Sequence, residues 1–141
     1  YLMTGRKNAV LLYGIGQVCG VNGLILLPDE WVAPKDIVFL AGYYGWNGSE
    51  YFVEHQSYDK KQWRELEKSG AVFLPAAGSR VKDFEWYEIK SIQSFGGYWT
   101  STAMDHEDRY GHLLYIESNA IRYWAAEEKE NGLSVRLVKD L

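Results

Sequence analysis

A run of nineteen residues without a charged side chain is the feature that most constrains the fold of this chain. It covers residues 9–27, AVLLYGIGQVCGVNGLILL, and ends abruptly at the sequence PDE, residues 28–30. A bilayer-spanning helix needs about 20 predominantly apolar residues, whereas Gln17, Asn22 and four glycines interrupt this run. We therefore expect no membrane span. The pattern predicts a core helix, including one over about residues 6–13, followed by a buried strand.

The composition indicates one globular domain. The 141 residues include 15 Lys and Arg against 19 Asp and Glu, which gives a net charge of −4. The basic residues are scattered rather than clustered, so we expect no nucleic-acid partner. Aromatic residues make up 16% of the chain, with eleven Tyr and six Trp. Aromatic side chains beyond the needs of a core favour a binding surface, because they give a large contact area at low entropic cost.

Cys19 is the one cysteine of the chain, which excludes an internal disulfide. It lies in GQVCGVNG without a candidate base beside it, so we predict a small buried hydrophobe. This cysteine usage fits a cytoplasmic protein and equally a bacterial surface protein. No signal peptide is visible and the chain begins at Tyr1, so we expect a processed or excised piece of a longer protein.

The clearest helix is predicted over residues 59–69, DKKQWRELEKS. Asp59 can cap it, Gln62 can complete a capping box, and Gly70 can end it. Tyr58 and Trp63 are spaced as a hydrophobic staple. The narrow apolar stripe predicts that this helix lies on a core rather than inside one.

Short strands separated by glycine are predicted for the remainder. GLILLP (23–28) and GAVFLP (70–75) are continuous apolar runs, which are typical of strands buried on both faces. Four later strands follow, and their short connections favour an antiparallel meander. The fold class is therefore α+β, with one or two helices and an antiparallel sheet. The later strands are predicted at residues 97–103, 111–118, 120–126 and 133–140.

Four phrases resemble a known family in their order and spacing. They are NGLILLPDEWVAP, WRELEKSGAVFLPAAGSR, GGYWTSTA and NGLSVRLVKD, which together span nearly all of the chain. They are similar to the "major paralogous domain" proteins of gut Bacteroidetes (fibrobacter succinogenes major paralogous domain-like). That resemblance implies a C-type-lectin-like fold, the scaffold that is also found in formylglycine-generating enzymes. It has helices packed on a twisted antiparallel sheet, with long loops in the C-terminal half.

The resemblance also implies a single C-type-lectin-like domain over residues 1–141, from the C-terminal part of a longer protein. Relatives carry further sequence before the point that matches Tyr1, and an N-terminal strand commonly pairs with the C-terminal one. Without that strand, residues 133–140 would present an open edge. We expect the missing segment, a second chain or the N-terminal region to cover it.

The acidic and histidine-rich stretch MDHEDRYGH (104–112) raises the question of a metal site. His106, Asp108 and His112 share one face of an extended strand, but the two histidines would lie about 20 Å apart at ~3.3 Å per residue. Zinc is therefore disfavoured, because its ligands must converge on one ion. Asp105, Glu107 and Asp108 are hard oxygen ligands, so calcium in a loop stays an alternative. The motifs by which C-type lectins bind sugar through calcium are absent, and we expect no cofactor.

Catalysis is not the expected activity. Formylglycine-generating enzymes use reactive cysteines near the end of the domain, whereas Cys19 lies near the start. Carboxylate pairs for glycoside hydrolysis, such as Glu107 with Glu117 or Asp108 with Glu127, have no favourable spacing. Ser101 and Thr102 lie within the strand phrase GGYWTSTA, and the resemblance makes hydrogen bonding inside the sheet the better interpretation.

Residues 104–131 have the composition of a contact surface, because Tyr, Trp and Arg alternate with short polar residues. The alternative is that Tyr115 and Trp124 belong to the core and that residues 127–131 form a solvated loop. Trp99, within the strand phrase, is assigned to the core. The anchoring of loops to the sheet is predicted for Arg80 and Arg136. The predicted ligand-binding residues are Asp105, His106, Glu107, Asp108, Arg109, Tyr110, Asn119, Arg122, Tyr123, Trp124 and Glu127.

The sequence thus predicts a non-catalytic, ligand-binding adhesion or recognition domain of a secreted or surface-attached bacterial protein, such as a lipoprotein. Its partner would be a protein or a glycan that binds the face formed by residues 104–131. One alternative is a structural or fimbria-tip subunit, and another is a receptor diversified by a retroelement. A third is an unusual enzyme of the formylglycine-generating-enzyme-like fold.

Overall fold

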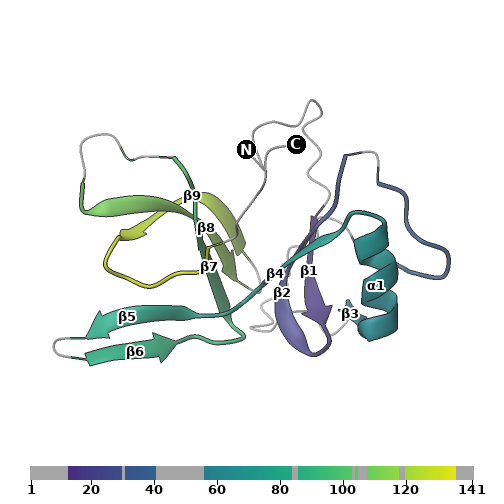
Figure 1. Cartoon of the computed structure of the whole chain (residues 1–141), viewed down its shortest axis with the longest axis horizontal. Helices are drawn as coiled ribbons and strands as arrows, with labels where there is room; N and C mark the ends of the chain where they lie inside the picture. The colour runs from purple at the N-terminus through teal and green to yellow at the C-terminus, as the bar shows by residue number, and fades with distance from the viewer. Residues whose placement is uncertain are drawn as a thin grey trace.

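The computed structural model describes residues 13–29, 31–40, 56–83, 86–102, 104, 108–117 and 120–135. At positions 83, 86, 120, 123 and 124 it describes the backbone alone. These residues form one helix and nine strands, arranged as three sheets (Figure 1). The predicted α+β class is therefore confirmed, with most of the regular structure in sheets.

The first sheet has four strands in the order β3-β1-β2-β4. These are β1 (Tyr13–Val18), β2 (Val21–Leu26), β3 (Ser57–Tyr58) and β4 (Val72–Pro75). β1 and β2 form an antiparallel hairpin, β3 runs parallel to β1, and β4 runs antiparallel to β2. The two apolar runs that were predicted as buried strands are β2 and β4.

The helix predicted within the uncharged run is wrong where the structure describes it, since residues 13–18 form β1. The rest of the predicted helix over residues 6–13 lies outside the described residues. Cys19 and Gly20 connect β1 to β2 with positive φ angles of 52° and 80°, as a two-residue hairpin turn requires. The prediction of a buried Cys19 is also wrong, because the turn exposes its side chain.

Helix α1 (Lys60–Lys68) begins and ends as predicted. The carboxylate of Asp59 accepts hydrogen bonds from the backbone N–H groups of Lys61 and Gln62, both at 2.8 Å. Gln62 Oε1 accepts from the Asp59 N–H at 3.0 Å, which completes the capping box. Trp63 packs against the apolar cluster that contains Tyr58, so the two residues of the predicted staple belong to one cluster.

The first sheet lies between α1 on one side and the C-terminal sheet on the other (Figure 1). On the helix side, Ile25 and Leu27 pack with Leu66 of α1. On the opposite side, Leu24 and Leu26 lie in a cluster that includes strand residues from the C-terminal half. Both faces of the first sheet are therefore buried. The C-terminal contributors to the second cluster are Tyr98, Leu114 and Ile116.

The C-terminal sheet is the antiparallel meander β7-β8-β9, as the short connections predicted. Its strands are β7 (Phe95–Trp99), β8 (Tyr110–Glu117) and β9 (Ala120–Glu128). The strand predicted at 97–103 thus ends earlier, at Trp99. Of the strand predicted at 133–140, the described part is a bridge at Ser134. Ser134 pairs with the edge of β7 through the Gly97 carbonyl and the Trp99 N–H.

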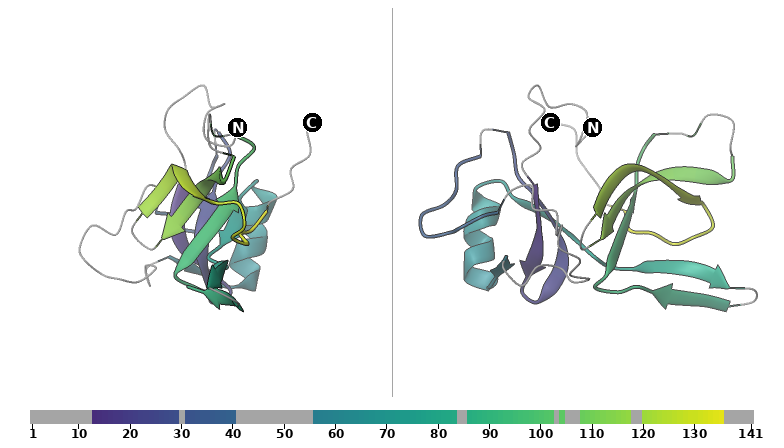
Figure 2. Two further views of the ribbon diagram at one scale, coloured as in Figure 1. Left: turned by 90° about the vertical axis from the view of Figure 1, so that its left-hand side faces the viewer. Right: turned by 180° about the vertical axis from the view of Figure 1, so that it is seen from behind.

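A third sheet is a hairpin that was not predicted, formed by β5 (Ser79–Asp83) and β6 (Trp86–Lys90). The right-hand view in Figure 2 shows it extending away from the first sheet. Its inner edge pairs with the segment after β9, because the N–H and C=O of Arg80 bond Gly132 at 2.7 Å each. The Arg80 side chain lies 4.0 Å from the centre of the Tyr87 ring. Arg136, the other predicted anchor, lies outside the described residues.

No helix in the described part of the chain is both long and apolar enough to cross a membrane. The uncharged run, where such a helix would have to lie, instead forms the β1–β2 hairpin from Tyr13 onward. Gly16 lets the hairpin approach the neighbouring segment closely, because an added Cβ at this position would lie 2.4 Å from the backbone carbonyl oxygen of Gln56.

Candidate functional site

An open groove of about 380 Å³ lies at one end of the C-terminal sheet. It forms where β7 ends, β8 begins and the chain turns after β9. Eight of the described residues line it. They are Trp99, Thr100, Ser101, Thr102, Met104, Tyr110, Gly111 and Lys129.

Trp99 is the largest side chain that lines the groove. The prediction that Trp99 belongs to the core is wrong, because its side chain is half-buried and lines the groove. Its ring packs on Gly111 of the neighbouring strand, where an added Cβ would lie 3.0 Å from Trp99 Cζ3. The absence of a side chain at Gly111 therefore lets the indole approach the sheet closely.

Three consecutive hydroxyl residues follow Trp99. The backbone N–H and the hydroxyl of Thr100 both bond the His112 carbonyl, at 3.0 and 3.1 Å. Ser101 and Thr102 lie beyond the end of β7 and are exposed. The prediction that they bond inside the sheet is therefore wrong, because the strand ends before them. Their hydroxyls line the groove, where they can donate and accept hydrogen bonds.

A charged rim lies beside the groove. Arg109 Nη2 is 2.8 Å from a carboxylate oxygen of Glu128, and the Tyr110 hydroxyl donates to the same oxygen at 3.3 Å. The hydrogen bond to Glu128 and the negative charge of this residue raise the pKa of Arg109. The Lys129 N–H bonds the Arg109 carbonyl at 2.9 Å, which joins the turn after β9 to the start of β8. These contacts position Tyr110 and Lys129 along one wall.

Further aromatic and charged residues lie on the outer face of the same sheet. Phe95 and Tyr115 are in ring contact, with their centroids 5.0 Å apart. Arg122 lies 5.2 Å from the centre of the Tyr115 ring, so the cation faces the aromatic side chain. The Tyr115 hydroxyl donates a hydrogen bond to Glu117. Burial and then this contact with the Glu117 carboxylate raise the pKa of Tyr115 to about 12.

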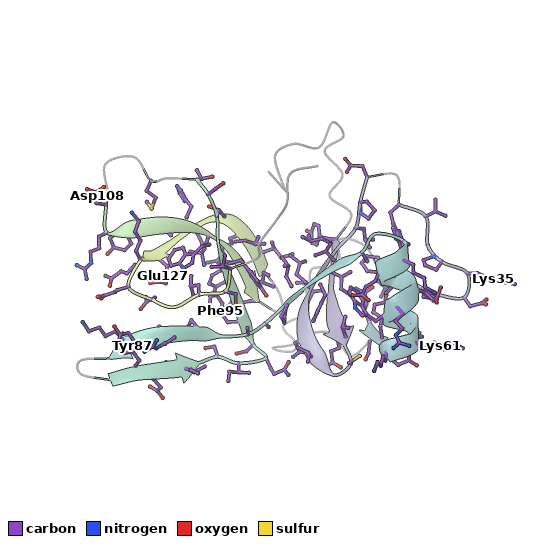
Figure 3. All side chains as sticks on the ribbon, viewed as in Figure 1. Lys35, Lys61, Tyr87, Phe95, Asp108 and Glu127 are labelled. Atoms are coloured by element: carbon purple, nitrogen blue, oxygen red, sulfur yellow. The ribbon has the colours of Figure 1, made fainter. Side chains whose placement is uncertain are left out.

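The structure describes five of the predicted ligand-binding residues with their side chains. Tyr110 lines the groove, and Arg109 lies on its rim. Asp108 is exposed next to them, whereas Arg122 lies on the outer face of the sheet. Glu127 accepts a hydrogen bond from the Asn131 amide at 2.9 Å and so holds the turn after β9. Figure 3 shows Asp108 and Glu127 on the same side of the molecule as Phe95, far from Lys35 and Lys61.

The other predicted residues lie outside this description. Asp105, His106, Glu107 and Asn119 are not among the described residues, and the side chains of Tyr123 and Trp124 are not described. The core alternative for Tyr115 is not met, because its side chain is half-buried and belongs to neither buried cluster. The groove adds seven residues that were not named as ligand-binding residues, although three of them, Met104, Gly111 and Lys129, fall within the predicted face of residues 104–131. Hydroxyls directly after an aromatic strand were a usable signal for three others. These seven are Trp99, Thr100, Ser101, Thr102, Met104, Gly111 and Lys129.

Among the described residues, no three His, Cys, Asp or Glu side chains gather as metal ligands would. The calcium alternative depends on Asp105 and Glu107, which lie outside the described residues, so it stays a prediction. His112 Nδ1 is buried and has no hydrogen-bond partner in the described structure. His106, its partner in the disfavoured zinc alternative, also lies outside the described residues.

The geometry therefore defines an aromatic and hydroxyl-rich groove at the end of an antiparallel sheet, beside a charged rim. Comparisons with protein-family models, with curated proteins and with solved structures gave no match. The functional interpretation consequently depends on the groove and on the resemblance described above.

Proposed function

We propose that this chain is a non-catalytic recognition domain that binds a protein or glycan ligand through the groove and its charged rim. The observation that carries the proposal is the composition of the groove, in which the half-buried Trp99 and Tyr110 lie beside three hydroxyl residues and Lys129. Ligand sites commonly combine apolar or aromatic surface with a few polar groups that fix orientation. The proposal includes location on a bacterial surface or in a secreted protein, from the resemblance.

The chemistry of the lining supports binding over catalysis. None of the eight described lining residues is a carboxylate, a histidine or a thiol. The three hydroxyls and the Lys129 ammonium instead provide hydrogen-bond donors around an aromatic surface. A ligand with an apolar face and several polar substituents would fit this arrangement, because its face can pack on Trp99 while its polar groups bond the hydroxyls.

The C-type-lectin-like fold is part of this proposal. Two features support it: the helix packed on the first sheet and, in the second half of the chain, the antiparallel C-terminal sheet. The groove lies in that second half and includes Met104, Tyr110 and Lys129 from the predicted ligand face of residues 104–131. The resemblance implies that this region meets the ligand.

The decisive experiment applies the purified domain to glycan and protein arrays, with and without calcium. Binding should be found, and Trp99→Ala should weaken it by about tenfold or more, because buried aromatic anchors dominate interfaces. Lys129→Ala should weaken it less. Calcium dependence would indicate that residues 105–108 take part through a bound ion.

Lys61→Ala is the matched control for Lys129→Ala, since both side chains are exposed but Lys61 lies on α1, far from the groove (Figure 3). It should leave binding unchanged. Circular dichroism would confirm that the Trp99→Ala variant is folded. A folded Trp99→Ala variant that binds as tightly as the wild type would contradict the proposed site.

A further inference from the structure

The outer edge of the β5–β6 hairpin is unpaired in the described structure. Arg80 in β5 lies opposite Ile89 in β6. The backbone N–H and C=O of Arg80 bond Gly132, so they point away from β6. In an antiparallel pair, two directly opposite residues either bond each other or both point away. The N–H and C=O of Ile89 must therefore point to the free edge, and those of Tyr87, two residues before, do the same.

This edge also exposes apolar side chains. The side chains of Ile89 and Tyr87 share one face of the strand, with 64% and 52% of their surface exposed. Arg80 covers one side of the Tyr87 ring at 4.0 Å. An edge with free backbone groups and exposed apolar residues is a template for pairing with another strand.

The charged side chains on the opposite face of β6 indicate which strand could pair with its free edge. Glu88 and Lys90 lie two residues apart on that face, with the ammonium 3.1 Å from the carboxylate. A two-fold axis through Ile89 would place each Glu88 opposite Lys90 of a second copy. This arrangement forms two cross-strand pairs of opposite charge, which stabilise an antiparallel sheet. The edge is thus complementary in charge to itself.

We propose that β6 pairs antiparallel with β6 of a second copy of this chain, about a two-fold axis through Ile89. The two Ile89 residues would exchange both backbone hydrogen bonds and cover each other's side chains. The two hairpins would then form one four-stranded sheet. This inference is independent of the proposed ligand groove, since no residue of β6 lines it.

Other two-fold registers are less favourable. An axis through Glu88 would set the two Glu88 carboxylates directly opposite each other, and like charges in that position destabilise a sheet. An axis through Tyr87 would pair neither Glu88 nor Lys90 with an opposite charge. Of these three registers, only the one about Ile89 both pairs the free backbone groups of β6 and sets Glu88 and Lys90 opposite residues of opposite charge. Because the strand has five residues, the interface is small and the dimer should be weak and concentration dependent.

Sedimentation velocity over a concentration series tests the register. The wild type should dimerise, and Glu88→Lys or Lys90→Glu should each weaken dimerisation about tenfold, because two attractive pairs become repulsive. The double variant Glu88→Lys/Lys90→Glu exchanges the charges and should restore the wild-type dimer. A wild type that stays monomeric at millimolar concentration, or a double variant as weak as the single ones, would overturn the proposal.

Disulfide trapping gives a second measurement that does not depend on charge. In a Cys19→Ser background, Ile89→Cys should crosslink rapidly on oxidation, because bonded opposite residues have Cα atoms about 5.5 Å apart, within disulfide range. Ile92→Cys is the matched control. Ile92 is equally exposed, at 61%, but lies beyond β6 and should not crosslink. Equal crosslinking at the two positions would contradict the register.

Discussion

The first sheet and the C-terminal sheet differ in how their faces are covered. In the first sheet the adjacent residues Leu24 and Ile25 point to opposite faces and are both 0% exposed. In the C-terminal sheet Leu114 is buried against the first sheet, whereas Trp99 and Tyr115 on the outer face are half-buried. The segment after β9 covers that outer face only in part, through contacts such as Leu133 beside Gly97.

Under the proposed function, this difference separates the residues that stabilise the fold from those that would bind a ligand. A sheet with apolar contacts on both faces contributes most of the burial, and nearly all of its surface is inaccessible to a partner. The C-terminal sheet buries Leu114 and Ile116 on one face. On the other face Leu113 is also buried, but the aromatic side chains of Trp99 and Tyr115 stay partly accessible. Substitutions in the first sheet should therefore affect folding, whereas those around the groove should affect binding.

The largest effect should come from Leu24→Ala. Leu24 is fully buried between the two sheets, and the substitution should lower the free energy of unfolding by about 3 kcal/mol through lost burial and a cavity. Urea unfolding would measure it. Val32→Ala is the control, because Val32 is 79% exposed and should change stability by less than about 0.5 kcal/mol. A similar loss of unfolding free energy in both variants would contradict the central role of the first sheet in stability.

The next effect concerns pH. Burial raises the pKa of Tyr58 to about 12, so the folded protein keeps this proton at pH values where the unfolded chain loses it. The stabilisation is fully present below pH 10 and is lost as the pH rises from 10 to 12. A shift of two pKa units corresponds to about 2–3 kcal/mol. The alkaline loss of stability should therefore be smaller in Tyr58→Phe, as measured by urea unfolding at a series of pH values.

Tyr115 allows the same effect to be tested in the C-terminal sheet. Its pKa is also raised to about 12, but the hydrogen bond to Glu117 is a cause in addition to burial. Glu117→Gln should lower the pKa of Tyr115 and leave that of Tyr58 unchanged. Ultraviolet absorbance of tyrosinate would follow both titrations, with Tyr58→Phe and Tyr115→Phe as references that assign them among the eleven tyrosines. A change in the pKa of Tyr58 in the Glu117→Gln variant would show that the electrostatics of the two sheets are coupled.

A smaller effect is expected at the helix that covers the first sheet. Asp59→Ala removes the two capping hydrogen bonds and should cost about 1 kcal/mol in stability. Thermal unfolding followed by circular dichroism would measure it. Gln62→Ala removes the reciprocal half of the capping box and should cost less. A larger loss for Gln62→Ala would mean that the Asp59 cap does not dominate.

The smallest effect should be that of Arg122→Ala on the outer face. The guanidinium is exposed above Tyr115, and such contacts contribute about 0.5 kcal/mol at exposed sites. Chemical unfolding should thus show little change. A loss comparable to that of Leu24→Ala would mean that the outer face belongs to the core, which would remove the contrast between the two sheets.

Sequence patterns predicted those elements whose signals are local. The capping box around α1 requires four consecutive residues, 59–62, and was confirmed atom by atom. The continuous apolar run of β2 predicted burial on both faces, and Leu24 to Leu26 are all buried. The uncharged run failed as a predictor of a helix, because buried strands and buried helices are equally apolar. The Cys19–Gly20 turn was the missed signal.

The candidate site was predictable in region but not in composition. Two of the predicted binding residues, Tyr110 and Arg109, lie on the groove and its rim. Trp99 was assigned to the core because it lies in a strand phrase, yet a strand has two faces and the phrase does not say which one is covered. The adjoining hydroxyls were placed in the sheet for the same reason, although β7 ends at Trp99.

The sequence by itself determined the α+β class, the helix with its cap and the order of the late strands, since each depends on hydrogen bonds or burial patterns between near neighbours. The tertiary structure decided which residues meet across long separations. It placed Gly111 beneath Trp99 and Lys129 beside both, and it paired Gly132 with Arg80 so that β6 became an edge. Such contacts depend on how the sheets pack and where the chain turns, which local patterns do not encode.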